Sequence, residues 1–363
     1  MTSSPPSRRL GDLLPLAGAL GLACVGSEVI ARLREADLTG QVALITGGSR
    51  GLGLALAREL ASEGCRLAIC ARDADELQRA ADDLRSRGAE VLTVNCDVAI
   101  RAHVDEMVDE VIAHYGQIDL LFTVAGIIEV GRLDLLDVQD FRRTMDIMFW
   151  GTLYPILAVL PGMRDRHYGR IATITSIGGK ISVPHLLPYS AAKFAAAGLS
   201  EGLSAELMDE GIHVTTIVPG LMRTGSHLAA EFRGDADRQR REYQWFALGA
   251  TSPLATRADR AARIIIRAVK RGETERTFPL IFDLASRVHC VAPATTIRLL
   301  RVIDRLLPSG NVSAGDVATA RGMAVEERID LPAWKAVTAL GRDAADAFNE
   351  KIGREPESPA SGA

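Results

Sequence analysis

Short apolar runs alternate with longer amphipathic stretches between about residues 38 and 282. Each run is separated from the next by enough residues for a helix. Such alternation is typical of βαβ units and predicts an α/β fold, a doubly wound, Rossmann-type parallel sheet with helices on both faces. We expect strands at residues 42–46, 67–70, 91–95, 120–124, 171–175 and 213–218.

A different kind of apolar segment precedes this pattern. Residues 13–27 carry no charge and are flanked by arginines on both sides. These 15 residues are fewer than the ~20 that a spanning helix needs. We expect an apolar N-terminal helix that attaches the protein to a membrane. Packing on the protein's own surface and a cleaved signal peptide stay open as alternatives.

A basic amphipathic helix is predicted near the other end, at residues 297–307. Arg298, Arg301 and Arg305 recur on one helical face, and apolar residues occupy the others. Such helices often lie on anionic membrane surfaces. For this segment alone, docking on the protein's own domain is the slightly preferred interpretation.

Composition changes this picture mainly by exclusion. The hydrophobic fraction of 47% and the charged fraction of 24% are ordinary for a globular protein, and the net charge of −4 argues against a nucleic-acid partner. The five cysteines include no C-x-x-C pair, which favours reduced thiols and a cytoplasmic location, free or on the cytoplasmic face of a membrane. No histidine spacing suits zinc, so we expect no metal site. We expect four parts in the chain: an apolar segment (1–37), a sheet domain (38–282), a helical extension (283–352) and a disordered tail (353–363).

A glycine-rich turn follows the first strand. Gly47, Gly51 and Gly53 give the spacing T-G-x-x-x-G-x-G, immediately before a helical stretch. Glycines let the backbone approach a pyrophosphate, and a helix N-terminus offers free N–H groups to it. The sequence therefore predicts a dinucleotide site that also includes the intervening residues Ser49, Arg50 and Leu52.

Three residues further along suggest proton-transfer chemistry. Tyr189 and Lys193 fall at i and i+4 on one face of a predicted helix, and Ser176 ends the fifth strand. A phenol is a poor acid or base at neutral pH, but a neighbouring ammonium stabilises the phenolate and lowers the tyrosine pKa. Tyr189 can then exchange a proton with a substrate oxygen, while Ser176 donates a hydrogen bond to that oxygen.

Together, T-G-x-x-x-G-x-G and Y-x-x-x-K resemble the motifs of the short-chain dehydrogenase/reductase family, over about residues 38–282. The resemblance implies nicotinamide-linked interconversion of a carbonyl and an alcohol. It makes Ser176, Tyr189 and Lys193 catalytic, and Lys193 would also hold the nicotinamide ribose. It further implies cofactor contacts in later loops, at Asp97, Val98, Ala125, Gly126, Pro219, Gly220 and Thr224.

The charge at the end of the second strand distinguishes the two nicotinamide cofactors. Ala71 stands where the resemblance would place an NAD-selecting Asp, Arg72 follows it, and Arg50 points toward the same corner. Two guanidiniums without a carboxylate suit a 2′-phosphate. Asp73 and Glu76, at D-x-x-E spacing, are interpreted as a helix capping box. The sequence therefore predicts NADP(H).

Two positions depart from the family pattern. Val124 replaces the Asn of the motif N-A-G, which removes a polar tie between strands. Met148 stands where similar enzymes often carry an Asn that holds a water in a proton path to the lysine. A methionine cannot anchor that water, so three outcomes for the proton relay stay open: another route, a slower one, or its loss.

Residues 221–252 are expected to form a substrate lid. Its residues Tyr243, Trp245, Phe246 and Leu248 would line a pocket for a small lipophilic carbonyl or alcohol, unless they pack on their own domain. We predict an NADP-dependent oxidoreductase with a membrane surface as partner and assembly into a homo-oligomer. Two alternatives stay open: an epimerase or dehydratase with the same cofactor, and a cofactor-binding sensor or scaffold with weak catalysis.

Overall fold

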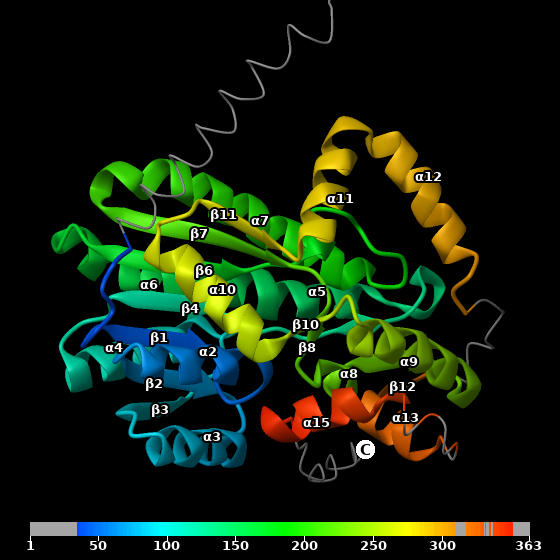
Figure 1. Ribbon diagram of the computed structural model, residues 1–363, viewed down its shortest axis with the longest axis horizontal. Coiled ribbons are helices and arrows are strands. Elements are labelled where there is room, and N and C mark those ends of the chain that lie inside the picture. The colour runs from blue at the N-terminus through cyan, green and yellow to red at the C-terminus, as the bar shows by residue number, and fades with distance from the viewer. Residues whose placement is uncertain (1–34, 309–316, 330, 332–333, 335–336, 351–363) are drawn as a thin grey trace, which may run out of the picture. The chain divides into compact units, whose positions relative to one another are not determined.

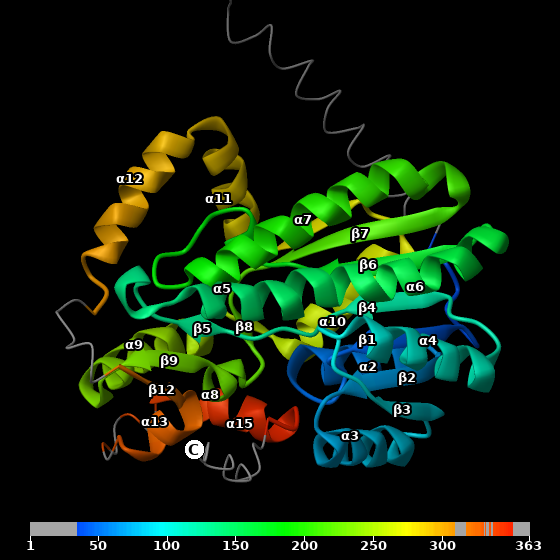
Figure 2. The ribbon, with the colours of Figure 1, turned by 180° about the vertical axis from the view of Figure 1, so that it is seen from behind.

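The computed structural model describes residues 35–308, 317–329, 331, 334 and 337–350. The chain divides after Asp37 into two units, and the fold shown in Figures 1 and 2 from Leu38 onward is that of the second. The predicted apolar helix at residues 13–27 and the predicted tail at 353–363 lie outside the described residues.

A seven-stranded parallel sheet forms the centre of the second unit. In spatial order its strands are β11 (Glu275–Phe278), β7 (Ile212–Pro219), β6 (Gly169–Ile174), β4 (Leu120–Thr123), β1 (Val42–Thr46), β2 (Arg66–Ala71) and β3 (Val91–Asn95). The predicted strands are all present, with small shifts at their ends. The pattern does not predict β11, because its sequence ERTF is short and contains two charges. The order places β1 beside β4, where the chain crosses between the two halves of the sheet, and ligands bind at such switch points.

Helices cover both faces of this sheet, which confirms the doubly wound fold. On one face α2 (Gly51–Ser62) packs beside α10 (Ala258–Lys270). On the other face lie α4 (Arg101–Tyr115), α6 (Gly151–Asp165) and α7 (Leu187–Leu207), as Figure 2 shows. The remaining helix of the nucleotide half, α3 (Ala74–Ser86), follows β2 and packs on β3.

The main core joins the sheet to α4 and α6. Leu44 and Leu121 from neighbouring strands are fully buried in the same cluster as Val104, Ile156 and Met163 from the helices. Burial of each such side chain contributes about 1.5–3 kcal/mol. This packing holds the carboxyl ends of β1 and β4 in fixed positions, and the candidate site is built on those ends.

One helical stretch among the described residues, Val138–Asp165, is long and apolar enough to cross a membrane, with a mean hydropathy of 1.3. It comprises α5 (Val138–Met145), a π-helical turn (Asp146–Trp150) and α6. Nearly half of its most apolar window, 44%, is buried against the rest of the fold. We interpret it as a core helix, because α6 contacts the sheet and α4.

The predicted lid and the C-terminal extension form one body. Strand β9 (Glu231–Gly234) pairs with β12 (Ala318–Arg321) from the extension and with β5 (Glu129–Val130). Around this small sheet lie α8 (Ser226–Ala229), α9 (Ala236–Thr251), α13 (Gly322–Glu327) and α15 (Ala339–Ala347). Tyr243 is fully buried in their shared core beside Phe232 and Trp334. The expectation that Tyr243 lines a substrate pocket is therefore wrong.

The predicted basic helix is α12 (Pro293–Asp304), and it follows α11 (Leu280–Val291) in a hairpin (Figures 1 and 2). No residue of α12 is buried, and the expected docking on the protein's own domain is confined to the end of the segment, where Asp304 Oδ1 lies 3.4 Å from His185 Nε2. Among the described cysteines, Cys65, Cys70 and Cys96 are buried, Cys290 on α11 is exposed, and all four are free thiols.

Candidate active site

The glycine loop has the geometry of a phosphate-binding turn. A Cβ at Gly53 would lie 2.0 Å from the carbonyl oxygen of Gly47, so only glycine fits where α2 begins. Gly47 itself has a φ of +67°, and a Cβ there would lie 2.8 Å from the Cα of Ala125. Helix α2 has no side-chain cap and no acidic residue in its first turn. Its N-terminus therefore fits a bound anion such as a dinucleotide diphosphate.

The ends of the neighbouring strands meet at this loop. The Thr46 hydroxyl at the end of β1 accepts hydrogen bonds from the Val124 and Ala125 amides, at 3.1 and 3.4 Å. These bonds join β1 to the end of β4 through backbone amides, which do not depend on the side chain at position 124. Thr224, from the loop after β7, is buried and lies 3.9 Å from the Cβ position of Gly51.

The predicted catalytic residues come together at the carboxyl edge of β6. Ser176 caps a single 3₁₀ turn, and its Oγ accepts from the Gly178 amide at 3.0 Å. A Cβ at Gly178 would lie 3.1 Å from the Tyr189 ring and 3.5 Å from Ser176 Oγ, so these two side chains flank the same glycine. One turn further along α7, Lys193 Nζ lies 5.9 Å from the centre of the Tyr189 ring and donates to the Ile174 carbonyl at 2.7 Å.

Burial dominates the ionisation of this cluster. It raises the pKa of Tyr189, and a hydrogen bond with Ser176 opposes that rise. It also lowers the pKa of Lys193 to about 8. Burial and the Ser176 hydrogen bond are the causes that set the pKa of Tyr189 in this structure, so the lowering by Lys193 stays a prediction for the site with its cofactor. Tyr189 therefore keeps its proton, which is the form that donates to a carbonyl oxygen.

The corner that holds Arg72 and Asp97, two of the predicted cofactor contacts, is more exposed. The Arg72 side chain is 61% exposed, and its Nη1 lies 3.8 Å from Asp97 Oδ2. Asp97 also accepts from the Ala99 amide at 3.0 Å. Val98 packs against Gly151, where a Cβ would lie 2.7 Å from the valine methyl. Of these residues Arg72 is the one whose charged group faces solvent.

Glu76 contributes to this corner in a way that the sequence did not indicate. Asp73 caps α3 as predicted, accepting from the Glu76 amide at 2.9 Å. The Glu76 carboxylate does not complete a capping box. It accepts instead from Ser49 Oγ at 3.2 Å and from Arg50 Nη1 at 3.4 Å. The expectation of two guanidiniums without a carboxylate is therefore wrong.

The loop after β7 mainly packs against β11 and α11. The Gly220 amide donates to the Phe278 carbonyl at 2.8 Å, and Pro219 is paired with Phe278 in the sheet. A Cβ at Gly220 would lie 2.1 Å from the Phe282 ring, so glycine is required for this packing. Thr224 Oγ1 accepts from the Ser226 amide at 3.3 Å.

Met148 lies in the π-helical turn and is buried. Its Cε would be 3.6 Å from a Cβ at Gly126. The methionine thus packs against the predicted cofactor loop after β4. It fills with an apolar side chain the place where a water-binding amide is expected.

His185 lies one turn before Tyr189 and connects α7 to the lid helix. Its Nδ1 is 2.7 Å from Glu242 Oε1, and both side chains are buried. Of the other three predicted lid residues, Phe246 packs against Phe232, whereas Trp245 and Leu248 line a cavity of about 420 Å³ with Leu306 and Trp334. That cavity includes none of Ser176, Tyr189 and Lys193 in its lining.

The C-terminal extension also reaches the glycine loop. The Gly51 amide donates to the Phe348 carbonyl at 2.8 Å, and Asn349 Nδ2 donates to the Ser49 carbonyl at 2.9 Å. The Glu350 carboxyl is buried beside Gly51. No motif in the sequence signals these contacts, because Asn349 and Ser49 are 300 positions apart.

Comparison with known proteins agrees with this geometry. A family model described as short chain dehydrogenase matches residues 41–232, just over half of the chain. The chain belongs to the short-chain dehydrogenase/reductase family. An uncharacterized oxidoreductase of Mycobacterium tuberculosis is 34% identical over 190 residues, 51% of this chain and 56% of that relative, so the chain spans just over half of the relative's length.

Two further members of the family show a similar degree of likeness. The 11-beta-hydroxysteroid dehydrogenase A of Sesamum indicum is 32% identical over 260 residues, 70% of this chain and 73% of that protein. Among solved structures, L-sorbose reductase from Gluconobacter frateurii, complexed with NADPH and L-sorbose, superposes with a TM-score of 0.59 at 25% identity. That match covers 67% of this chain and 97% of the reductase.

Proposed function

We propose that this family member is an NADP-dependent oxidoreductase that interconverts a carbonyl and an alcohol on a lipophilic substrate. The observation that carries the proposal is the convergence of Ser176, Tyr189 and Lys193 at one end of β6, on the sheet edge that also holds the glycine loop. A relative that is named as a hydroxysteroid dehydrogenase and a solved reductase complexed with NADPH support the same reaction class and cofactor.

Each of the three side chains has a distinct role in this reaction. Ser176 donates a hydrogen bond to the substrate oxygen and orients it. Tyr189, protonated in its buried setting, gives its proton to that oxygen in the reducing direction and recovers it from the alcohol in the other. Lys193 is held by the Ile174 carbonyl close to the tyrosine and would contact the nicotinamide ribose. NADPH, when bound, supplies the hydride that completes the reduction.

The experiment that tests this function is turnover of NADPH with a panel of ketones of increasing apolar size. We expect measurable oxidation of NADPH that is stronger with the more apolar ketones. Tyr189→Phe should lower turnover by about 10²–10⁴-fold, the usual contribution of a general acid, while the dissociation constant for NADPH changes little. Near-normal turnover in this variant would contradict the assigned role of Tyr189.

The sensor or scaffold alternative has one specific observation in its favour. Met148 is buried where a water-binding residue is expected, so the proton path to Lys193 has lost an anchor. A protein that binds NADPH with normal affinity but oxidises it with none of the ketones would favour this alternative. A product that is epimerised or dehydrated, with no net change in NADPH, would favour the other one.

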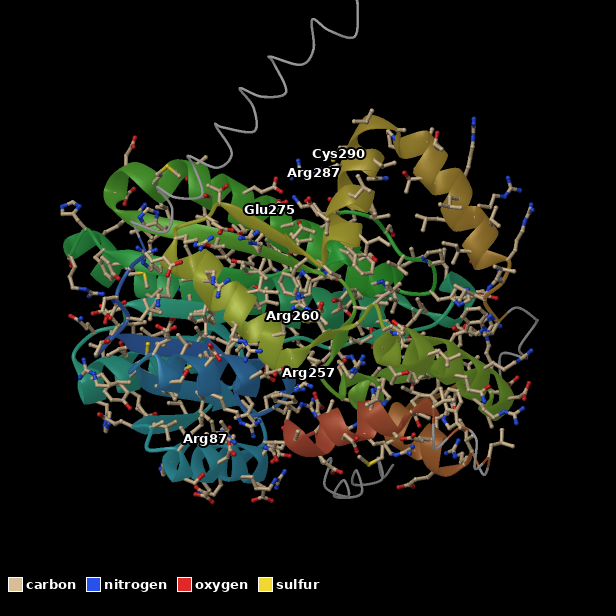
Figure 3. The ribbon with its side chains drawn as sticks, viewed as in Figure 1. Arg87, Arg257, Arg260, Glu275, Arg287 and Cys290 are labelled. Atoms are coloured by element: carbon tan, nitrogen blue, oxygen red, sulfur yellow. The ribbon has the colours of Figure 1, made fainter. Side chains whose placement is uncertain are left out.

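We also propose that the hairpin of α11 and α12 lies on an anionic membrane surface, with the nucleotide site in the cytosol. Several large apolar side chains on the hairpin are more than half exposed, a concentration that marks an interaction surface. They include Leu280, Leu284, Val291, Ile297, Leu299 and Val302. Positive charge from Arg298 and Arg301 on α12, and from Arg305 directly after it, complements anionic headgroups. Arg287 on α11, labelled in Figure 3, is paired with Asp283.

Sedimentation with lipid vesicles tests the membrane surface. We expect the protein to bind vesicles that contain a third of phosphatidylglycerol better than vesicles of phosphatidylcholine alone. Changing Arg298 and Arg301 of α12 and the following Arg305 to Glu should abolish this preference. The matched control changes Arg257 and Arg260, which lie at the start of α10 (Figure 3) and away from the hairpin. Equal loss in both variants would contradict the proposed surface.

A further inference from the structure

Residues 348–350, which we call the latch, cover the glycine loop. They follow directly after α15, and their backbone amides at Phe348 and Glu350 donate back to its last turn. The Phe348 carbonyl accepts from the Gly51 amide at 2.8 Å. A Cβ at Gly51 would lie 2.8 Å from Glu350 Oε1. The Glu350 carboxyl thus fills the space that the missing glycine side chain leaves in front of α2.

The latch places a carbonyl oxygen and a carboxyl group in front of α2, where a bound phosphate would place its own oxygens. A helix N-terminus with open N–H groups binds oxygen acceptors and negative charge. Here the Phe348 carbonyl uses the first amide of α2, and the Glu350 carboxyl lies 3.5 Å from Arg50 Nη1. A dinucleotide diphosphate would need the same amide and the same space above Gly51. The latch and the diphosphate therefore cannot bind the loop together.

Asn349 fixes the latch on the loop. Its Nδ2 donates to the Ser49 carbonyl at 2.9 Å and to the Glu76 carbonyl at 3.0 Å, while its Oδ1 accepts from Arg79 Nε at 3.0 Å. The residue has a φ of +58°, a left-handed conformation that asparagine adopts more readily than most residues. These bonds tie the latch to both sides of the nucleotide corner, the loop and α3.

Two other features allow the latch to be released. Glu350 is buried, and among the described residues its Oε2 accepts no hydrogen bond. Its nearest cation, Arg50 Nη1, is 3.5 Å away, and a buried carboxylate oxygen held only by so long an ion pair costs free energy that release to water would partly recover. The helix that carries the latch has its own attachment, because Ala345 of α15 packs against Gly225. Residues 348–350 can therefore leave while α15 stays in place.

We propose that residues 348–350 form an autoinhibitory latch that competes with the diphosphate of the dinucleotide for the glycine loop, so that the cofactor binds only when the latch is released. This inference rests on the proposed function, because it assumes that the loop binds a nicotinamide dinucleotide. The apparent dissociation constant of the cofactor is then its intrinsic value divided by the fraction of molecules in which the latch is open. A latch that is closed in nine molecules of ten weakens binding by roughly tenfold.

Two truncations separate the latch from the residues after it. Removing residues 349–363 deletes Asn349 and Glu350, whereas removing residues 351–363 leaves both in place and is the matched control. We expect the longer deletion to tighten NADPH binding by roughly tenfold in a calorimetric titration, and the shorter one to leave it unchanged. Asn349→Gly should also tighten binding, because glycine keeps the left-handed backbone while losing the three side-chain hydrogen bonds.

Hydrogen exchange gives a readout that needs no turnover. Saturating NADPH should slow exchange in the glycine loop and accelerate it in the peptide that contains residues 348–350. Unchanged or weaker NADPH binding after removal of residues 349–363, or slower exchange of the latch with NADPH, would overturn the proposal. If neither the intact chain nor the longer deletion binds NADPH or NADH, the proposed function and the latch proposal both fail. If the intact chain binds and the deletion does not tighten, the latch alone fails.

Discussion

The two halves of the candidate site lie at one edge of one sheet but are completed in different ways. In the catalytic half, Lys193 donates to the Ile174 carbonyl only 19 positions earlier, and Ser176 and Tyr189 lie between them in the sequence. In the nucleotide half, Ser49 accepts from Asn349, 300 positions away. The first half is therefore specified by one strand–turn–helix segment, whereas the second depends on how the C-terminal extension folds back.

The electrostatics of the two halves differ in the same way. Lys193 is a buried cation whose pKa is lowered by desolvation. Arg50, in contrast, lies between the carboxyl groups of Glu76 and Glu350. Burial raises the pKa of Glu350 to about 7, the charge on Arg50 opposes that rise, and Glu76 adds to it. Burial thus favours the neutral form of both groups, the deprotonated Lys193 in the catalytic half and the protonated Glu350 in the nucleotide half.

Replacing Lys193 by Met should produce the largest change, and the change should depend on pH. In the folded chain burial lowers the pKa of Lys193 to about 8, whereas the ordinary pKa of a lysine is 10.5. Between these two pH values the unfolded chain binds more protons than the folded chain. Burying the charged Lys193 therefore lowers the free energy of unfolding below pH 8, and this loss disappears as the pH rises. The stability of Lys193→Met relative to the wild type should therefore fall by up to about 3 kcal/mol between pH 7.5 and 10.5.

Denaturant unfolding at several pH values measures this difference, and Lys180→Met is the matched control. The carboxylates of Glu201 and Glu275 outweigh desolvation and raise the pKa of Lys180. Its relative stability should not fall over the same range. A Lys193→Met curve that is parallel to the wild type at every pH would contradict the buried, partly neutral lysine described here.

Sequence alone predicts most of the sheet and the catalytic half, for a physical reason. Buried parallel strands are apolar runs, and the tyrosine and lysine share one helix, so both features depend on residues that are close together in the sequence. Glu76 shows the limit of that approach, since its spacing from Asp73 suits a capping box while its carboxylate binds Ser49 and Arg50. Strand β12 and the latch depend on long-range packing around Tyr243 and Trp334, which leaves no local pattern.

Met148 lies between the two halves and tests whether they share one packed core. Met148→Asn would bury an amide against Gly126, and a buried polar group without partners costs about 1–3 kcal/mol. We expect the midpoint of thermal unfolding to fall by roughly 2–8 °C. Met148→Leu, which nearly conserves volume, should change it little. If Asn recruits a water there, stability stays close to normal and turnover rises, and the packing argument is then wrong.

The smallest expected effect concerns the cofactor preference of the nucleotide half. Arg72 is the exposed guanidinium at the end of β2, and its contact with Asp97 is long, at 3.8 Å, so it is free to turn toward a 2′-phosphate. Arg72→Ala should weaken NADPH binding by roughly tenfold and NADH binding much less. One charge-assisted contact is worth about 1.5–3 kcal/mol, and the lower end applies because Arg72 also interacts with Asp97.

Arg87→Ala is the matched control, because Arg87, labelled in Figure 3, follows the C-terminal end of α3 and pairs with Asp83. Titrations of both cofactors decide the matter. Equal losses for NADPH and NADH, or a wild-type preference for NADH, would mean that Glu76 and Asp97 rather than the arginines set the choice, and that this corner binds the ribose hydroxyls of NAD.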